Sequence, residues 1–287
     1  MVSHPVVDLR SLDTLWFQVA GTVCNLACTH CLVSASPTNH THEMMTLAEI
    51  RPYLDEGARL GVKEYYFTGG EPFLNPEMEA ILEAALRFGP ATVLTNGVLL
   101  RRDRCARLRA MADAAEYSLD VRVSLDGYDA ETNDAIRGQG TFERILRGVR
   151  NLADAGLNPV LTVTEACSEA ATDEGRRRLF DLLARHGIDR PRVKILPLFK
   201  IGAEAERGGA YEGWQRLSEG DVPPEAWDHL QCHSCRVVTD QGVWVCPILV
   251  NEPTGRMGHR LVDALDAFPL SHSACWTCHV RGATCRT

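Results

Sequence analysis

The chain has 287 residues, of which 45% are apolar and 24% are charged, and its formal net charge is −8. This length and apolar share suit one large domain with a smaller appendage, and the lack of a dense Lys/Arg block argues against a nucleic-acid partner. The first thirteen residues are neither basic nor a long apolar run, so we expect no secretion signal or membrane span, and a cytoplasmic protein.

The first predicted strand, residues 14–19, is followed by three cysteines in CxxxCxxC spacing: Cys24, Cys28 and Cys31. Three thiolates on one short loop can hold three irons of a [4Fe–4S] cluster. The fourth iron then has no protein ligand and can bind a substrate or cofactor. The loop therefore predicts a cluster that takes part in chemistry and does more than carry electrons.

Short β-rich runs recur along the first two thirds of the chain, and each but the last is followed by a helical pattern. Nearly continuous apolar runs are typical of strands buried on both faces of a parallel sheet, and strand–helix alternation implies right-handed crossovers. Six such units are too few for a closed eight-stranded barrel. We therefore expect an α/β fold with an open, partial (β/α)6 TIM-like barrel over residues 1–200. The predicted strands are 14–19, 63–68, 91–95, 120–125, 159–164 and 192–197.

Polar and glycine residues stand where these strands end. Gly69 and Gly70 let the backbone approach a ligand closely, because neither has a Cβ, and the Glu71 carboxylate beside them suits a cationic amine. Asn96 ends the third strand and Ser124 the fourth, at the edge where barrel sites are built. The alternative for the glycines is an ordinary strand-ending turn, and for Asn96, which precedes a glycine, it is turn chemistry.

After residue 201 the periodicity fades, and glycines with a Pro-Pro pair mark a linker. Beyond the linker lie six of the eleven cysteines, which without a secretory signal indicate metal ligands and not disulfides. We therefore predict a second, metal-organised module over residues 201–287. Two CxxC pairs could also supply a structural zinc site. The six cysteines are Cys232, Cys235, Cys246, Cys275, Cys278 and Cys285.

The CxxxCxxC loop, followed by Gly69-Gly70-Glu71-Pro72, resembles the radical S-adenosylmethionine (SAM) enzymes over about residues 15–198. The resemblance implies that the three cysteines hold a [4Fe–4S] cluster and that SAM chelates its open iron. A 5′-deoxyadenosyl radical would then take a hydrogen atom from the substrate. It also implies that Glu71 meets the SAM amine and Ser124 the SAM ribose or carboxylate. His30 replaces the aromatic residue usual before the third cysteine, and its ring would lie against adenine.

The order of the later cysteines, with Gly242 before Cys246 and Cys275-Trp-Thr-Cys278, resembles the SPASM or twitch extensions of these enzymes. That resemblance implies one auxiliary [4Fe–4S] cluster, because two clusters need more cysteines. Four ligands chosen from six leave two thiols over. A spare thiol could return a hydrogen atom to a substrate radical, for which Cys246, or Cys167 after the fifth strand, is the candidate; an inert buried cysteine is the alternative.

The length and layout resemble radical SAM epimerases and dehydrogenases that act on a small polyol or amino sugar, and this is the first functional hypothesis. The second is peptide modification, against which the short stretch before the first strand leaves no room for a leader-binding domain. The third is a non-catalytic Fe–S electron carrier, which has no use for the Gly-Gly-Glu-Pro motif. Expected partners are a small-molecule substrate or a peptide and an electron donor such as flavodoxin or ferredoxin, with no nucleic acid and no membrane.

Overall fold

The computed structural model describes residues 3–188 and 190–282. Nine strands form its main sheet: β2 (Thr14–Gln18), β3 (Glu64–Thr68), β4 (Ala91–Thr95), β5 (Leu119–Ser124), β6 (Val160–Thr164), β7 (Arg192–Leu196), β8 (Cys235–Thr239), β9 (Gly242–Trp244) and β10 (Arg256–Gly258). Their order is β10-β9-β8-β2-β3-β4-β5-β6-β7. Neighbours from β8 to β7 are parallel, and the β8-β9-β10 hairpins are antiparallel.

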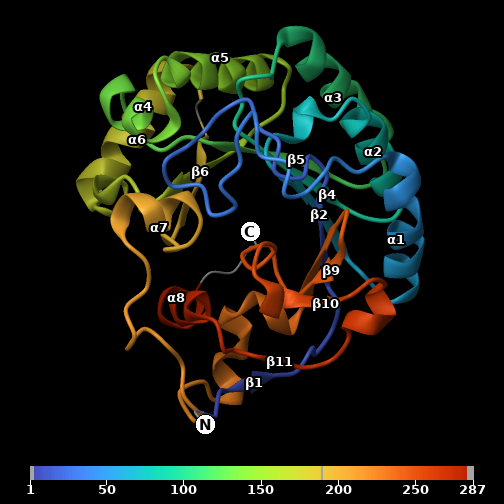
Figure 1. The fold of residues 1–287 in the computed structure, drawn as a ribbon. Helices are drawn as coiled ribbons and strands as arrows, with labels where there is room; N and C mark the ends of the chain where they lie inside the picture. The colour runs from blue at the N-terminus through green and yellow to red at the C-terminus, as the bar shows by residue number, and fades with distance from the viewer. Residues whose placement is uncertain (1–2, 189, 283–287) are drawn as a thin grey trace.

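The sheet curls but does not close, with β7 at one end and β10 at the other. Six helices cover its outer face (Figure 1): α1 (Leu47–Arg59), α2 (Met78–Ala85), α3 (Arg102–Ala114), α4 (Ala130–Arg137), α5 (Thr141–Asp154) and α6 (Asp173–Arg185). In α5, Phe142, Ile145 and Val149 recur at helical spacing and are buried in the core of the barrel wall. The parallel α/β fold with an open barrel is therefore as predicted.

All six predicted strands are present, within one residue at each end. The apolar runs located them because strands of a parallel sheet are buried on both faces. In β2 all five residues are buried, including the polar Thr14 and Gln18. Residues facing the helices join one apolar core. Those facing inward join a second core, which contains Cys24 and the described cysteines of the C-terminal region.

The C-terminal region continues the barrel sheet, which the sequence did not predict. Strand β8 pairs in parallel with β2, with Thr14 opposite Cys235. The predicted domain boundary at residue 200 stays a prediction. The main sheet contains strands from both sides of this boundary. The buried Arg236 guanidinium holds this region together by donating hydrogen bonds of 2.6–3.0 Å to the backbone carbonyls of Cys232, Cys235, Ala264 and Asp266.

The remaining β-strands and α-helices of the described chain lie around the C-terminal region. They are β1 (Val6–Val7), which pairs with β11 (Phe268–Pro269), and the helices α7 (Ala203–Gly208) and α8 (Ser273–Arg281). The pairing of β1 with β11 ties the start of the described chain to its C-terminal part. Among the described residues, none of the helices combines the length and apolar character needed to cross a bilayer.

Candidate functional site

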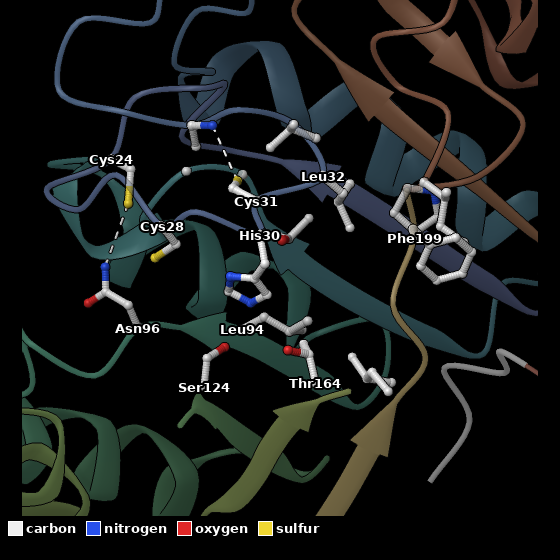
Figure 2. Close-up of a pocket in the computed structure, with 18 of the residues that line it drawn as sticks. Cys24, Cys28, His30, Cys31, Leu32, Leu94, Asn96, Ser124, Thr164 and Phe199 are labelled. Carbon is white, nitrogen blue, oxygen red and sulfur yellow. Dashed lines mark hydrogen bonds between the residues drawn. The ribbon is translucent and has the colours of Figure 1, made fainter. Parts of the chain in front are cut away.

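A cavity of about 270 Å³ lies at the carboxyl ends of the barrel strands (Figure 2). The strands run parallel, so their carboxyl ends meet at one edge, which is where such barrels build their sites. The C-terminal region closes one side of the cavity with Val237, Pro247, Ile248 and Val250. The strand ends contribute Gln18, Thr68, Leu94, Ser124, Thr164 and Leu196.

Cys24, Cys28 and Cys31 all line this cavity, on the loop between β2 and α1. The backbone N–H groups of Leu26 and Ala35 donate to the sulfurs of Cys24 and Cys31, at 3.4 and 3.2 Å. Burial raises the pKa of Cys24 to about 12 and that of Cys28 to about 11. Because thiols must lose their protons to ligate a metal, binding iron here releases protons, and donors aimed at sulfur stabilise the resulting thiolates.

Gly69 and Gly70 line the cavity and also lie against the cysteine loop. A Cβ on Gly70 would stand 1.9 Å from the carbonyl oxygen of Val23, and Gly69 has a φ of +134°. The Gly70 N–H donates to the Gly21 carbonyl at 2.8 Å. The two glycines are needed because backbone packs on backbone here. We call this close-packed glycine backbone the cradle, and its expected contact with a ligand stays a prediction.

Glu71 lies in the interior between the ends of two strands. Its carboxylate is fully buried and accepts hydrogen bonds from the Thr95 hydroxyl (2.7 Å) and the N–H groups of Asn96 (2.8 Å) and Phe73 (3.1 Å). It is not among the described side chains that line the cavity. Burial raises the pKa of Glu71 and the hydrogen bonds oppose that rise. This carboxylate ties the exit of β3 to the end of β4, and its expected contact with a cationic amine stays a prediction.

Asn96 makes the expected turn contact and also contacts the cysteine loop, whereas its expected contact with the cofactor stays a prediction. Its side-chain oxygen accepts the N–H of Val98 at 3.0 Å, which is turn chemistry. Its amide nitrogen donates to Asn25 Oδ1 at 2.7 Å and lies 3.7 Å from Cys24 Sγ. Figure 2 shows this side chain directed at the cysteine. Asn96 therefore positions the cysteine loop from the end of β4.

A buried ionic network lies beside the cavity. Asp126 Oδ2 is 2.6 Å from the Arg137 guanidinium and 3.0 Å from His30 Nε2. Its Oδ1 accepts two hydrogen bonds from Thr164, at 2.7 and 2.8 Å. Burial alone would raise the pKa of Asp126, but Arg137 and His30 outweigh burial and hold that pKa well below its usual range.

Arg137 is a site residue that the sequence analysis missed. It lines the cavity, and its Nη1 lies 4.0 Å from Cys28 Sγ. Burial would lower the pKa of Arg137, but the Asp126 carboxylate and the neighbouring thiol raise it, so the side chain is a fixed cation. A basic residue at the end of a helix is common, so nothing in the local sequence marked it.

His30 points into the cavity, above Leu94, Ser124 and Thr164 (Figure 2). Asp126 holds its Nε2, whereas its buried Nδ1 has no hydrogen-bond partner within the described residues. Buried polar atoms are nearly always paired, so this atom indicates a missing ligand. The placements of His30 and Ser124 fit the predicted SAM contacts, which stay predictions.

Four of the C-terminal cysteines line a second, much smaller cavity of about 20 Å³: Cys232, Cys246, Cys275 and Cys278. All four are buried, and burial raises the pKa of Cys232 to about 12. Cys235 is buried too, with its sulfur 3.9 Å from the Val245 carbonyl oxygen, and it does not line this cavity. Cys285 lies outside the described residues. Four of the C-terminal cysteines thus share one cavity, and Cys235 lies outside its lining.

The two candidates for a hydrogen-donating thiol do not reach the main cavity. Cys246 belongs to the four-cysteine set, and Cys167 lies in the core between sheet and helices. Neither is among the described residues that line the main cavity. The structure therefore does not support a catalytic role for either thiol.

The structure also bears on the zinc alternative. Within the described chain, no three His, Cys, Asp or Glu side chains converge closely enough to hold one metal ion. A zinc ion needs four ligands at about 2.0–2.3 Å around a single point. Four C-terminal cysteines line one small cavity, and the choice between a zinc ion and an Fe–S cluster there stays a prediction.

Three comparisons with known proteins agree on the fold. The family model described as "Radical SAM superfamily" matches residues 19–183, more than half of the chain. Mycofactocin maturase MftC of Mycolicibacterium smegmatis is 37% identical over 208 residues, 72% of this chain and 45% of the relative. GTP 3′,8-cyclase of Pectobacterium atrosepticum is 37% identical over 48% of this chain and 42% of the relative. The matches thus span less than half the length of these relatives.

Among solved structures, SuiB of Streptococcus suis resembles the chain. Its complex with S-adenosylmethionine and its complex with the precursor peptide SuiA each give a TM-score of 0.64 at 14% identity. The two matches cover 86% and 87% of this chain, and 63% and 62% of SuiB. At this identity the likeness concerns the fold alone.

Proposed function

The chain belongs to the radical SAM superfamily, and on that premise we propose that it is a radical SAM enzyme that modifies a peptide. The family uses a [4Fe–4S] cluster and SAM. When bound, these cofactors supply a 5′-deoxyadenosyl radical that removes a hydrogen atom from the substrate.

One observation supports this chemistry above all: Cys24, Cys28 and Cys31 face a cavity framed by glycine backbone and strand ends. Three sulfurs can hold three irons of a cubane and leave the fourth for SAM. The N–H donors at Cys24 and Cys31 and the Arg137 cation near Cys28 stabilise the negative charge of the thiolates. The unpaired His30 Nδ1 and the cradle at Gly70 fit a bound cofactor.

The relatives support a peptide substrate over a polyol or amino sugar. MftC is named a maturase, and SuiB was solved with a precursor peptide. The wall of the cavity away from the strand ends is mostly apolar, with Leu32, Phe199, Ile248 and Val250. A polyol would bury hydroxyl groups without hydrogen-bond partners on such a wall, and each of them would cost binding free energy. The same wall suits an apolar peptide side chain.

We further propose that Cys232, Cys246, Cys275 and Cys278 bind one auxiliary [4Fe–4S] cluster. These four sulfurs line one cavity, and cysteine thiolates are the usual ligands of such clusters. Gln231 lines both this cavity and the main one, so the two sites are separated there by a single residue. That closeness lets the auxiliary site accept an electron from a substrate radical.

The test uses reconstituted protein, dithionite, SAM and peptides with deuterated side chains. Transfer of deuterium into 5′-deoxyadenosine, together with a mass change in the peptide, supports peptide modification. The Cys28→Ala variant, which lacks one of the three proposed ligands, should form no 5′-deoxyadenosine. Deuterium arriving only from labelled polyols or amino sugars would replace this proposal with the first hypothesis of the sequence analysis. No SAM cleavage at all would leave only an electron carrier.

A further inference from the structure

A groove of about 770 Å³ on the outer face of the barrel is lined by five arginines, and we call it the arginine groove. Two come from the start of α3 and three from α5, which pack side by side along one edge of the molecule (Figure 1). Among the described residues that line the groove, only Asp154 is acidic. The arginines are Arg101, Arg102, Arg144, Arg147 and Arg150.

The groove brings together several arginines whose charges are not neutralised by ion pairs within the described residues. Arg101 lies 3.4 Å from Asp103. Within the described residues, the other four form no ion pair and no side-chain hydrogen bond. By contrast, Arg104 and Arg107 further along α3 both pair with Glu79. A concentrated positive surface on a protein of net charge −8 attracts a partner of opposite charge.

The groove is separate from the main cavity, since the two share no lining residue, yet it leads to the cysteine loop. Val98 lies in the lining of the groove, and its N–H donates to Asn96 Oδ1 at 3.0 Å. The amide nitrogen of the same Asn96 side chain, Nδ2, lies 3.7 Å from Cys24 Sγ. One side chain therefore connects the groove to a cluster cysteine, which is the short path that electron transfer requires.

We propose that the arginine groove docks an acidic one-electron carrier protein of the flavodoxin or ferredoxin class, which reduces the cluster through the Val98–Asn96–Cys24 path. The inference rests on the proposed function, because only radical SAM chemistry calls for this electron. In the transfer the reduced carrier loses one electron and the cluster gains one, and no bond forms or breaks. An acidic substrate peptide is the competing occupant, but it would bind away from the cavity where its chemistry takes place.

The test measures binding of oxidised flavodoxin to the cluster-loaded protein by titration calorimetry. The double variant Arg144→Glu/Arg147→Glu reverses two exposed groove charges on α5. We expect it to weaken binding about tenfold or more and to reduce the dependence of affinity on salt. The control Arg177→Glu/Arg185→Glu makes the same charge change at exposed positions of α6 and should shift affinity by less than about twofold.

A second readout separates docking from catalysis. With dithionite as reductant, the groove variant should form 5′-deoxyadenosine at the wild-type rate, and with reduced flavodoxin it should be about tenfold slower. The docking proposal is overturned if the groove variant binds flavodoxin as tightly as the wild type, or if the α6 control loses as much flavodoxin affinity as the groove variant. It is also overturned if the groove variant loses binding of an acidic peptide and keeps binding of flavodoxin. Failure of wild-type protein to cleave SAM with dithionite would overturn the proposed function instead, and the binding titration reports on the groove independently.

Discussion

Asp126 and Arg137 form a 2.6 Å ion pair in which neither side chain is more than 7% exposed. One follows β5 and the other ends α4, so the pair joins a strand end to a helix end next to the cysteine loop. The same loop is held on this side by the Thr29 N–H, which donates to the Ile136 carbonyl at 2.9 Å. The pair therefore sets the position of α4 against the loop that carries the cluster cysteines.

Replacing Arg137 by alanine should lower the free energy of unfolding by about 3–5 kcal/mol, because it leaves the Asp126 charge buried without its main partner. A denaturant titration measures the loss. The control is Arg176→Ala, which breaks an exposed pair with Asp173 at 2.7 Å and should cost less than about 1 kcal/mol. Equal losses in the two variants would contradict a special role for the buried pair.

The same pair predicts how stability depends on pH. The pKa of Asp126 is depressed in the folded protein, so its contribution is present above the ordinary aspartate pKa of about 3.9 and is lost as the pH falls through the depressed value. On cluster-free protein, the stability difference between wild type and Asp126→Asn should stay constant from about pH 7 to 5 and shrink below about pH 4. A difference that shrinks between pH 7 and 5 would show that another group is responsible.

Gly70→Ala should release the cysteine loop. The added Cβ would stand 1.9 Å from the Val23 carbonyl oxygen, so backbone must move and the three sulfurs can no longer share one cluster. We expect iron bound at this site, followed by its visible absorption, to fall at least about tenfold. Gly213→Ala meets nothing within 4 Å and has no left-handed φ, so it should bind iron normally. A Gly70→Ala protein with full iron would refute the cradle.

Serine substitutions can identify the auxiliary ligands. Replacing Cys232, Cys246, Cys275 or Cys278 should reduce iron from about eight to about four atoms per chain, because a second [4Fe–4S] cluster is lost. Cys235→Ser is the matched control, since this buried thiol does not line the small cavity. Iron analysis of the five variants decides the point. Iron loss in Cys235→Ser equal to that in the others would assign Cys235 to the cluster.

His42 ties the cysteine loop to the C-terminal region. Its Nδ1 lies 2.8 Å from Asp240 Oδ1 and its Nε2 lies 2.9 Å from the Val250 carbonyl oxygen. Asp240 also accepts the Glu43 N–H at 3.1 Å. Asp240→Ala should therefore cost about 1–3 kcal/mol and speed amide hydrogen exchange in residues 36–46. The control is Asp221→Ala, which changes an exposed aspartate at another turn. If amide exchange in residues 36–46 is the same in Asp240→Ala as in the wild type, Asp240 does not hold the cysteine loop.

The sequence by itself determined the features that depend on neighbouring residues. Apolar runs located every strand from β2 to β7, because burial on both faces leaves a continuous pattern. The covalent spacing of Cys24, Cys28 and Cys31 predicted three sulfurs on one loop. The sequence also indicated that Gly69 and Gly70 are needed for a close backbone approach, although the nearest partner in the structure is the cysteine loop.

Only the tertiary structure decided which side chains face one another. The Glu71 carboxylate turns to the end of β4 and away from the cavity, and Arg137 reaches Cys28 from a different part of the chain. Five arginines scattered over residues 101–150 gather in one groove because α3 packs on α5. Strand β8 joins β2 across more than two hundred residues. Such contacts depend on how faces pack after folding, and local periodicity carries no information about them.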